Sequence, residues 1–175
     1  MRAVVVYESL FGNTRHIAEA VADGLRAAAD EVVVLPAAEA GDAPQADLLV
    51  IGGPTHVHGM SSETTRRGAV EDHAKHPDRP APDVTGPALR DWIQALPEGG
   101  GTAAAAFDTR IDKSRLLTGS AAHGIAKRLR RRGYTVVGEE GSFLVSGTAG
   151  PLVDGEEARA RAWAAALPAL TPAGR

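Results

Sequence analysis

Short runs of consecutive apolar residues alternate along this chain with longer stretches in which apolar residues recur every three or four positions. Most of the runs are rich in valine, isoleucine and leucine, residues 103–107 are alanines followed by a phenylalanine, and all are too short to form helices, so they are predicted to be β-strands. They cover residues 4–7, 32–35, 48–51, 103–107, 134–137 and 142–145. We expect Pro36 to end the second strand and the Gly52-Gly53-Pro54 sequence to end the third.

The stretches with helical spacing are predicted to be amphipathic helices. One runs from about residue 14 to 29, with Ile17, Val21 and Leu25 on its apolar face. Others are expected after an N-cap at Thr85, at about residues 120–132, and after an N-cap at Asp154.

Within the predicted strands, apolar residues do not alternate with polar ones. Strands of this kind are buried on both faces, which is typical of a parallel sheet covered by helices. Strand and helix alternate, so the fold class is α/β, a five-stranded doubly wound parallel sheet with helices on both faces. No G-x-G-x-x-G sequence follows the first strand, and the chain is short, so we favour the strand order 2-1-3-4-5 over the Rossmann order.

A single domain is expected over residues 1–170, with residues 171–175 as a tail. Residues 61–84 interrupt the alternation of strands and helices. They are polar and contain Pro77, Pro80 and Pro82 near their end. We therefore interpret them as an insertion or long loop, which in a compact domain is usually functional or disordered.

Composition narrows the possible functions. The 175 residues include no cysteine, which excludes disulfides, thiolate nucleophiles and cysteine-ligated metals. The net charge of −3 argues against a nucleic-acid partner, and the basic residues 127–132 are interpreted as the solvated last turn of a helix. No apolar run reaches the roughly 20 residues that span a membrane. The chain begins at once with a strand, so we expect no signal peptide and a cytoplasmic location.

Three loops should converge at the carboxyl ends of the first, third and fourth strands, where doubly wound sheets bind their ligands. They are residues 8–14, 53–62 and 108–119. The first loop combines the hydroxyl groups of Ser9 and Thr14 with Gly12, Asn13 and the start of a helix, which suits an anion. It lacks the lysine of a Walker A loop. An ordinary helix cap at Asn13 or Thr14 is the alternative interpretation.

At this point the chain resembles the flavodoxin family. The sequence Ser9-Leu10-Phe11-Gly12-Asn13-Thr14 is similar to the family's phosphate loop, which wraps the phosphate of FMN. Phe11 departs from the strict flavodoxin pattern and matches the quinone-reductase branch of the wider family. The second loop resembles the segment that flanks the flavin ring, through Pro54, Thr55, His56, Val57, His58 and Gly59.

The resemblance implies how these loops would hold FMN. Gly59 is the candidate for a peptide that reorients as the flavin changes its redox state. His56 and His58 are the candidates for stacking on the ring, in place of the usual tryptophan or tyrosine. The third loop contributes the last group of candidates, which are Phe107, Asp108, Thr109 and Arg110.

Two further questions concern charged and metal-ligating side chains. Arg110 either approaches the flavin or pairs with Asp108 or Asp112, and the sequence leaves both open. His56, His58, His73 and His76 are close enough in sequence to suggest a transition metal. Since no H-E-x-x-H spacing is present, we favour no metal site. The absence of G-x-S-x-G also argues against a Ser-His-Asp hydrolase.

The sequence leads to three hypotheses about function. The first is an FMN-binding protein that carries electrons between redox partner proteins, in which the flavin does the chemistry. The second is an FMN-dependent oxidoreductase that uses NAD(P)H and a small acceptor such as a quinone, with a pocket completed by residues 61–84 or by a second subunit. The third is a flavin-free binding module. A monomer and a homodimer both remain open.

Overall fold

A parallel sheet forms the centre of the protein. The computed structural model describes residues 1–41, 44–56 and 59–172. In spatial order the sheet contains β2 (Glu31–Pro36), β1 (Arg2–Tyr7), β3 (Leu48–His56) and β5 (Ala103–Ile111). Beyond β5 lie β6 (Thr135–Val136) and β7 (Gly141–Val145), which both pair with it in parallel. This arrangement confirms the predicted 2-1-3-4-5 order.

The fifth position of the sheet is shared by two short strands. β6 pairs with the beginning of β5 at Ala103 and Ala104, and β7 pairs with the end of β5 from Phe107 to Ile111. Gly138 lies between them with a φ of +66°. Both apolar runs predicted near the C-terminus are therefore strands, but they occupy one edge position of the sheet rather than two.

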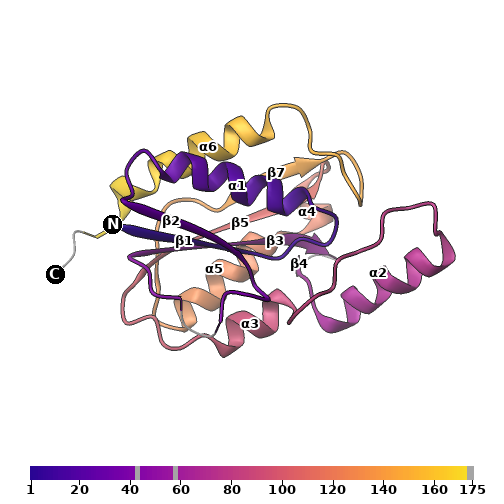
Figure 1. Ribbon diagram of the computed structural model, residues 1–175, viewed down its shortest axis with the longest axis horizontal. Coiled ribbons are helices and arrows are strands. Elements are labelled where there is room, and N and C mark those ends of the chain that lie inside the picture. The colour runs from indigo at the N-terminus through magenta and orange to yellow at the C-terminus, as the bar shows by residue number, and fades with distance from the viewer. Residues whose placement is uncertain (42–43, 57–58, 173–175) are drawn as a thin grey trace.

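Helices cover both faces of the sheet. Figure 1 shows α1 (Asn13–Leu25) and α6 (Glu156–Ala166) on one face, and α3 (Leu89–Ala95) and α5 (Ala121–Arg131) on the other. The remaining short helical segments are α4 (Arg115–Thr118) and the 3-10 helix η1 (Pro168–Leu170). None of the helices in the described part of the chain combines the length and apolar character needed to cross a bilayer.

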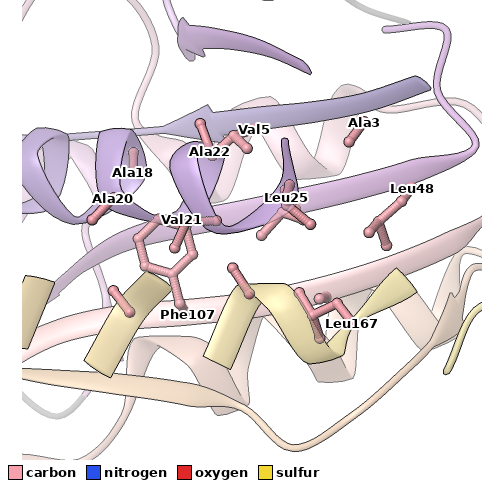
Figure 2. Packing of buried hydrophobic residues seen from close by; sticks show 14 of the residues in the cluster. Ala3, Val5, Ala18, Ala20, Val21, Ala22, Leu25, Leu48, Phe107 and Leu167 are labelled. Atoms are coloured by element: carbon pink, nitrogen blue, oxygen red, sulfur yellow. The ribbon is translucent and has the colours of Figure 1, made fainter. Parts of the chain in front are cut away.

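Successive strand residues point to opposite faces, so the sheet has two hydrophobic cores. Ala3 and Val5 pack with α1 and α6, as Figure 2 shows, whereas Val4 and Val6 pack with α3 and α5. Burying both faces of every central strand requires the uninterrupted apolar runs seen in the sequence. Phe107 anchors the first core, where its ring meets the rings of Phe143 and Trp163 edge-on.

The third strand does not end at Gly52 as predicted. β3 continues to His56, and Gly52 lies opposite Phe107 in the ladder with β5. A Cβ atom at Gly52 would meet Cζ of Phe107 at 2.0 Å. The glycine is thus required by the close approach of an aromatic ring, and it does not interrupt the pairing of the strands.

Several predicted helix ends were also wrong. α1 ends at Leu25, four residues before the predicted end. α3 begins after Ala88 rather than Thr85, whose backbone N–H is instead bonded to Asp83 in a turn. The N-cap of α6 is Gly155, in the left-handed conformation, rather than Asp154. The predicted N-caps, Thr85 and Asp154, are residue types that are common in turns as well as at helix N-termini, so the residue type alone did not distinguish a cap from a turn.

The interrupting segment contains a helix that the sequence analysis did not predict. α2 (Glu63–Lys75) begins with a capping box between Ser62 and Thr65. Figure 1 shows α2 projecting away from the sheet and its covering helices. Of the residues in α2, only Arg66 is buried. A polar sequence with one buried side chain gives almost no helical apolar pattern, which is why it resembled a loop.

Candidate functional site

The three predicted loops meet at the carboxyl ends of β1, β3 and β5. A cavity there is lined by residues of the first loop, the end of β3 and the end of β5, with additional contributions from Val145 and Thr148. The cavity measures about 50 Å³, which is too small for a whole nucleotide. A larger ligand would therefore extend over the rim.

Predicted site residues line this cavity from each of the three loops. They are Ser9, Leu10, Phe11, Asn13, Thr14, Pro54, Thr55, His56, Thr109 and Arg110. Ile111, Val145 and Thr148 also line it and were missed. Val145 is the last residue of β7 and Thr148 lies in the loop after it, and nothing in their sequence distinguishes them from ordinary strand and loop residues.

The first loop leaves the positive end of α1 exposed to the cavity. Gly12 is the N-cap residue with a φ of +89° and has no side chain to cap the helix. The alternative of an ordinary cap at Asn13 or Thr14 is therefore wrong. Asn13 instead donates to the carbonyl of Ala149 at 3.0 Å, and Ser9 Oγ accepts from the first-turn N–H of Arg15 at 3.2 Å. The other N–H groups at the start of the helix favour an anion.

A buried hydrogen bond joins the first and third loops. The hydroxyl oxygens of Thr14 and Thr109 are 2.7 Å apart, and both side chains are buried. Both residues also line the cavity. The pair therefore holds the start of α1 against the end of β5 while leaving hydroxyl oxygens at the cavity wall.

Asp108 lies beneath the cavity rather than in its wall. Its carboxylate is fully buried and accepts hydrogen bonds from the hydroxyls of Thr55, Ser120 and Ser142 and from the N–H of Ala122. All four of these bonds are internal to the protein, and the direct contact between Asp108 and a cofactor stays a prediction. Phe107 is likewise in the hydrophobic core and absent from the cavity wall.

Arg110 is connected to Asp108 through a hydroxyl group. Its Nε donates to Ser142 Oγ at 2.8 Å, and Ser142 Oγ donates to Asp108 Oδ1 at 2.7 Å. Arg110 also lines the cavity. Arg110 is thus linked to Asp108 through Ser142 and not by a direct ion pair, and its approach to a flavin stays a prediction.

His56 is the polar group in the cavity wall that lacks a partner. Its Nε2 is buried and has no hydrogen-bond partner among the described residues. Burial lowers the pKa of His56 from its ordinary value, so the ring is held neutral. A neutral imidazole with a free nitrogen can stack on or hydrogen-bond to a ligand.

The remaining candidates of the first two loops do not reach the cavity wall. Gly12 caps α1, and Gly59 lies in β4 (Gly59–Met60), which pairs antiparallel with β3. A Cβ atom at Gly59 would meet nothing within 4 Å, so no close approach requires a glycine there. Val57 and His58 lie outside the described residues.

The histidines suggested for a metal do not form such a site in the described part of the chain. No group of three or more histidine, aspartate or glutamate side chains there could hold a metal ion. His73 belongs to α2 and His76 is its C-cap residue. Both were predicted to lie in an irregular loop.

A buried ion pair attaches α2 to the site. Arg66 Nε lies 3.3 Å from Glu8 Oε1, and both side chains are buried. Glu8 also accepts from the hydroxyl of Ser61 and the N–H of Leu89, and Arg66 donates to the carbonyl of Gly86. Burial raises the pKa of Glu8 more than these partners lower it. Because Glu8 is the first residue of the first loop, this ion pair ties α2 to the loop that borders the cavity.

Comparison with known proteins agrees with this geometry. The flavodoxin family matches residues 5–86, which include the first two loops of the cavity. The fold of the chain is flavodoxin-like. No curated protein matches it closely enough to be assigned as a relative.

Solved structures extend the likeness of this flavodoxin-like chain to its whole length. Oxidised Flavodoxin 2 from Bacillus cereus has a TM-score of 0.66 and 20% identity, with 97% of this chain and 99% of that chain covered. A flavodoxin from the domain Archaea has a TM-score of 0.61 and 19% identity, with 95% and 96% covered. A flavodoxin, WrbA-like protein from Agrobacterium tumefaciens has a TM-score of 0.55 and 18% identity, with 97% and 96% covered. At these identities the structures show the fold.

Proposed function

We propose that this protein binds FMN and transfers electrons between redox partner proteins. The observation that carries the proposal is the exposed positive end of α1 beside the buried Thr14–Thr109 hydroxyl pair, at the point where β1, β3 and β5 end. A doubly wound sheet binds its ligand at this position, and a helix N-terminus favours a phosphate.

The residues present fit FMN. Ser9, Asn13 and Thr14, which line the cavity, would hold its phosphate. The segments at the ends of β3 and β5 would flank the rest of the cofactor, with the free nitrogen of His56 facing it. When bound, FMN supplies reversible uptake of one or two electrons. The protein orients the cofactor and surrounds its ring with neutral and cationic groups.

A second candidate is an FMN-dependent oxidoreductase that uses NAD(P)H and a small acceptor. The observation that favours it is a second cavity between α2 and the first loop, which a carrier between proteins does not need. A cytoplasmic location suits both candidates.

The first experiment is an absorbance spectrum of the purified protein, followed by titration with FMN. We expect flavin absorbance, or its recovery with tight binding on titration. A protein that stays colourless at saturating FMN would refute both candidates and favour the flavin-free module. Steady-state oxidation of NAD(P)H with a quinone would favour the second candidate over the first.

The phosphate site is tested by substitutions at Thr14. Thr14→Glu should abolish FMN retention, because it introduces a negative charge where the phosphate binds. Thr14→Val keeps the shape of the side chain and should weaken FMN binding about tenfold through the lost hydroxyl. Thr64→Glu, at an exposed position in the first turn of α2, is the matched control. Unchanged affinity in both Thr14 variants would place the phosphate elsewhere.

A further inference from the structure

A second cavity lies between α2 and the first loop. It measures about 340 Å³, which falls within the range of small-molecule sites. Phe11 and Thr148 line both this cavity and the candidate FMN cavity, so the two are neighbours. Any molecule in the second cavity would therefore lie beside the first loop.

The inward face of α2 explains why this space is not filled. Arg66, Ala69 and His73 are three and four residues apart in sequence, so they share one face of the helix. Arg66 at one end of this face is fixed by its ion pair with Glu8, whereas Ala69 and His73 line the cavity. A small alanine at the centre of that face leaves a gap that a larger apolar residue would close.

Both apolar and polar side chains line the cavity. Phe11 and Pro80 provide flat apolar surfaces, and Ala69 and Ala149 add methyl groups. These surfaces suit a flat ring, since an aromatic ligand gains both from burial and from stacking on Phe11. The apolar part of the cavity is therefore compatible with a planar aromatic molecule.

The polar lining residues include His73. Nδ1 of His73 is buried and has no hydrogen-bond partner among the described residues. The charged groups nearby neutralise each other, because Arg79 Nη1 donates to Asp72 Oδ2 at 2.8 Å. A buried polar atom without a partner is costly, and a ligand atom that meets it removes that cost. An Nδ1–H group would donate to a ligand oxygen.

We propose that this cavity binds a flat aromatic ring that carries a carbonyl oxygen, with the ring against Phe11 and the oxygen accepting from His73. This inference rests on the second candidate function, the FMN-dependent oxidoreductase, in which the bound ring would belong to NAD(P)H or to the acceptor. The nicotinamide ring of a pyridine nucleotide and a free quinone share this chemistry. His73 and Phe11 are then specificity residues contributed by the insertion and the first loop.

The test measures binding rather than turnover, on FMN-saturated protein. The probes are oxidised nicotinamide mononucleotide and 1,4-naphthoquinone, each titrated separately and followed by ligand-observed NMR. His73→Ala should weaken binding of the recognised probe about 5- to 15-fold, as expected for one lost hydrogen bond. Phe11→Leu should weaken it by a similar factor. His76→Ala is the matched control, because His76 lies three residues away on the same segment, is exposed and does not line the cavity.

The outcomes decide the proposal directly. Binding of either probe that depends on His73 and not on His76 supports it, and the probe that binds identifies the source of the ring. Failure of both probes to bind at millimolar concentration overturns it, as does equal binding by wild type and His73→Ala. FMN titration of His73→Ala should give the wild-type affinity. A wild-type protein that does not hold FMN would refute the proposed function, and the same titrations on the protein as purified would still test the cavity.

Discussion

The buried carboxylate of Asp108 holds together the elements that frame the candidate FMN site. Oδ2 accepts from Thr55 Oγ1 at 3.1 Å, Ser120 Oγ at 2.7 Å and the N–H of Ala122 at 3.0 Å. Oδ1 accepts from Ser142 Oγ at 2.7 Å. One carboxylate thus connects the end of β3, the start of α5 and β7. Replacing it with the amide of asparagine is the sharpest perturbation of this arrangement.

The expected loss of stability follows from the four bonds. In Asp108→Asn the amide oxygen can keep the three bonds of Oδ2, but the amide NH₂ cannot accept the hydrogen bond that Ser142 Oγ donates to Oδ1. One charge-assisted bond is lost, and the other three become neutral. Hydrogen bonds to charged groups contribute roughly 1.5–3 kcal/mol each, and relief of the buried charge offsets part of the loss. We therefore expect a decrease of about 2–3 kcal/mol in the free energy of unfolding.

Urea denaturation followed by circular dichroism measures this decrease. The midpoint should fall while the slope of the transition stays unchanged, because the substitution does not alter the surface exposed on unfolding. Asp112→Asn is the control, since Asp112 is exposed four residues further along the chain, and its effect should stay within about 0.5 kcal/mol. If Asp108→Asn is also within 0.5 kcal/mol of wild type, the carboxylate does not hold the site together.

Other predictions concern the packing of β3 and the attachment of α2. Gly52→Ala would place a Cβ 2.0 Å from the Phe107 ring and should lower the free energy of unfolding by about 3 kcal/mol, measured in a thermal melt. Gly68→Ala in α2 is the control, because its Cβ would meet nothing within 4 Å, and it should raise the free energy of unfolding by about 0.5–1 kcal/mol. The folded protein retains the Glu8 proton to a higher pH than the unfolded chain, because burial raises its pKa. The unfolding free energy should therefore fall as pH rises from the ordinary glutamate value to the raised one, and Glu8→Gln should remove this slope in pH-dependent denaturation. Arg66→Met leaves the Glu8 carboxylate buried without its cation and should accelerate proteolysis within α2 at neutral pH; cleavage at the wild-type rate would contradict this.

The central strands could be predicted because an uninterrupted run of apolar residues of this length indicates a strand that is buried on both faces. Val4 and Val6 face one core while Ala3 and Val5 face the other, and only strands buried on both faces need apolar residues at every position. The helix boundaries were less predictable. Thr85 has the properties of an N-cap, yet it lies in a turn before α3, because Ser, Thr and Asp suit turns and caps equally.

Site residues whose position follows from the order of the strands could be predicted from the sequence. Site residues whose role depends on hydrogen bonds between distant side chains could not. Ser9 and Thr14 follow the first strand, so topology alone places them at the ligand-binding edge of the sheet. The role of Asp108 could not be derived in this way. Its partners Thr55, Ser120 and Ser142 come from three distant segments, and nothing in the local sequence indicates that they meet.

The two proposed binding sites are formed by different elements of the fold. The proposed FMN contacts lie on strand ends and on α1, which are fixed by the hydrophobic cores and by the network of Asp108. The proposed ring-binding cavity depends on α2, whose one buried residue pairs with Glu8. Substitutions on the inward face of α2 therefore have few packing constraints to satisfy. This arrangement would allow the identity of the bound ring to change while the proposed FMN site keeps its shape. Among the described residues, the two sites share only Phe11 and Thr148 in their walls.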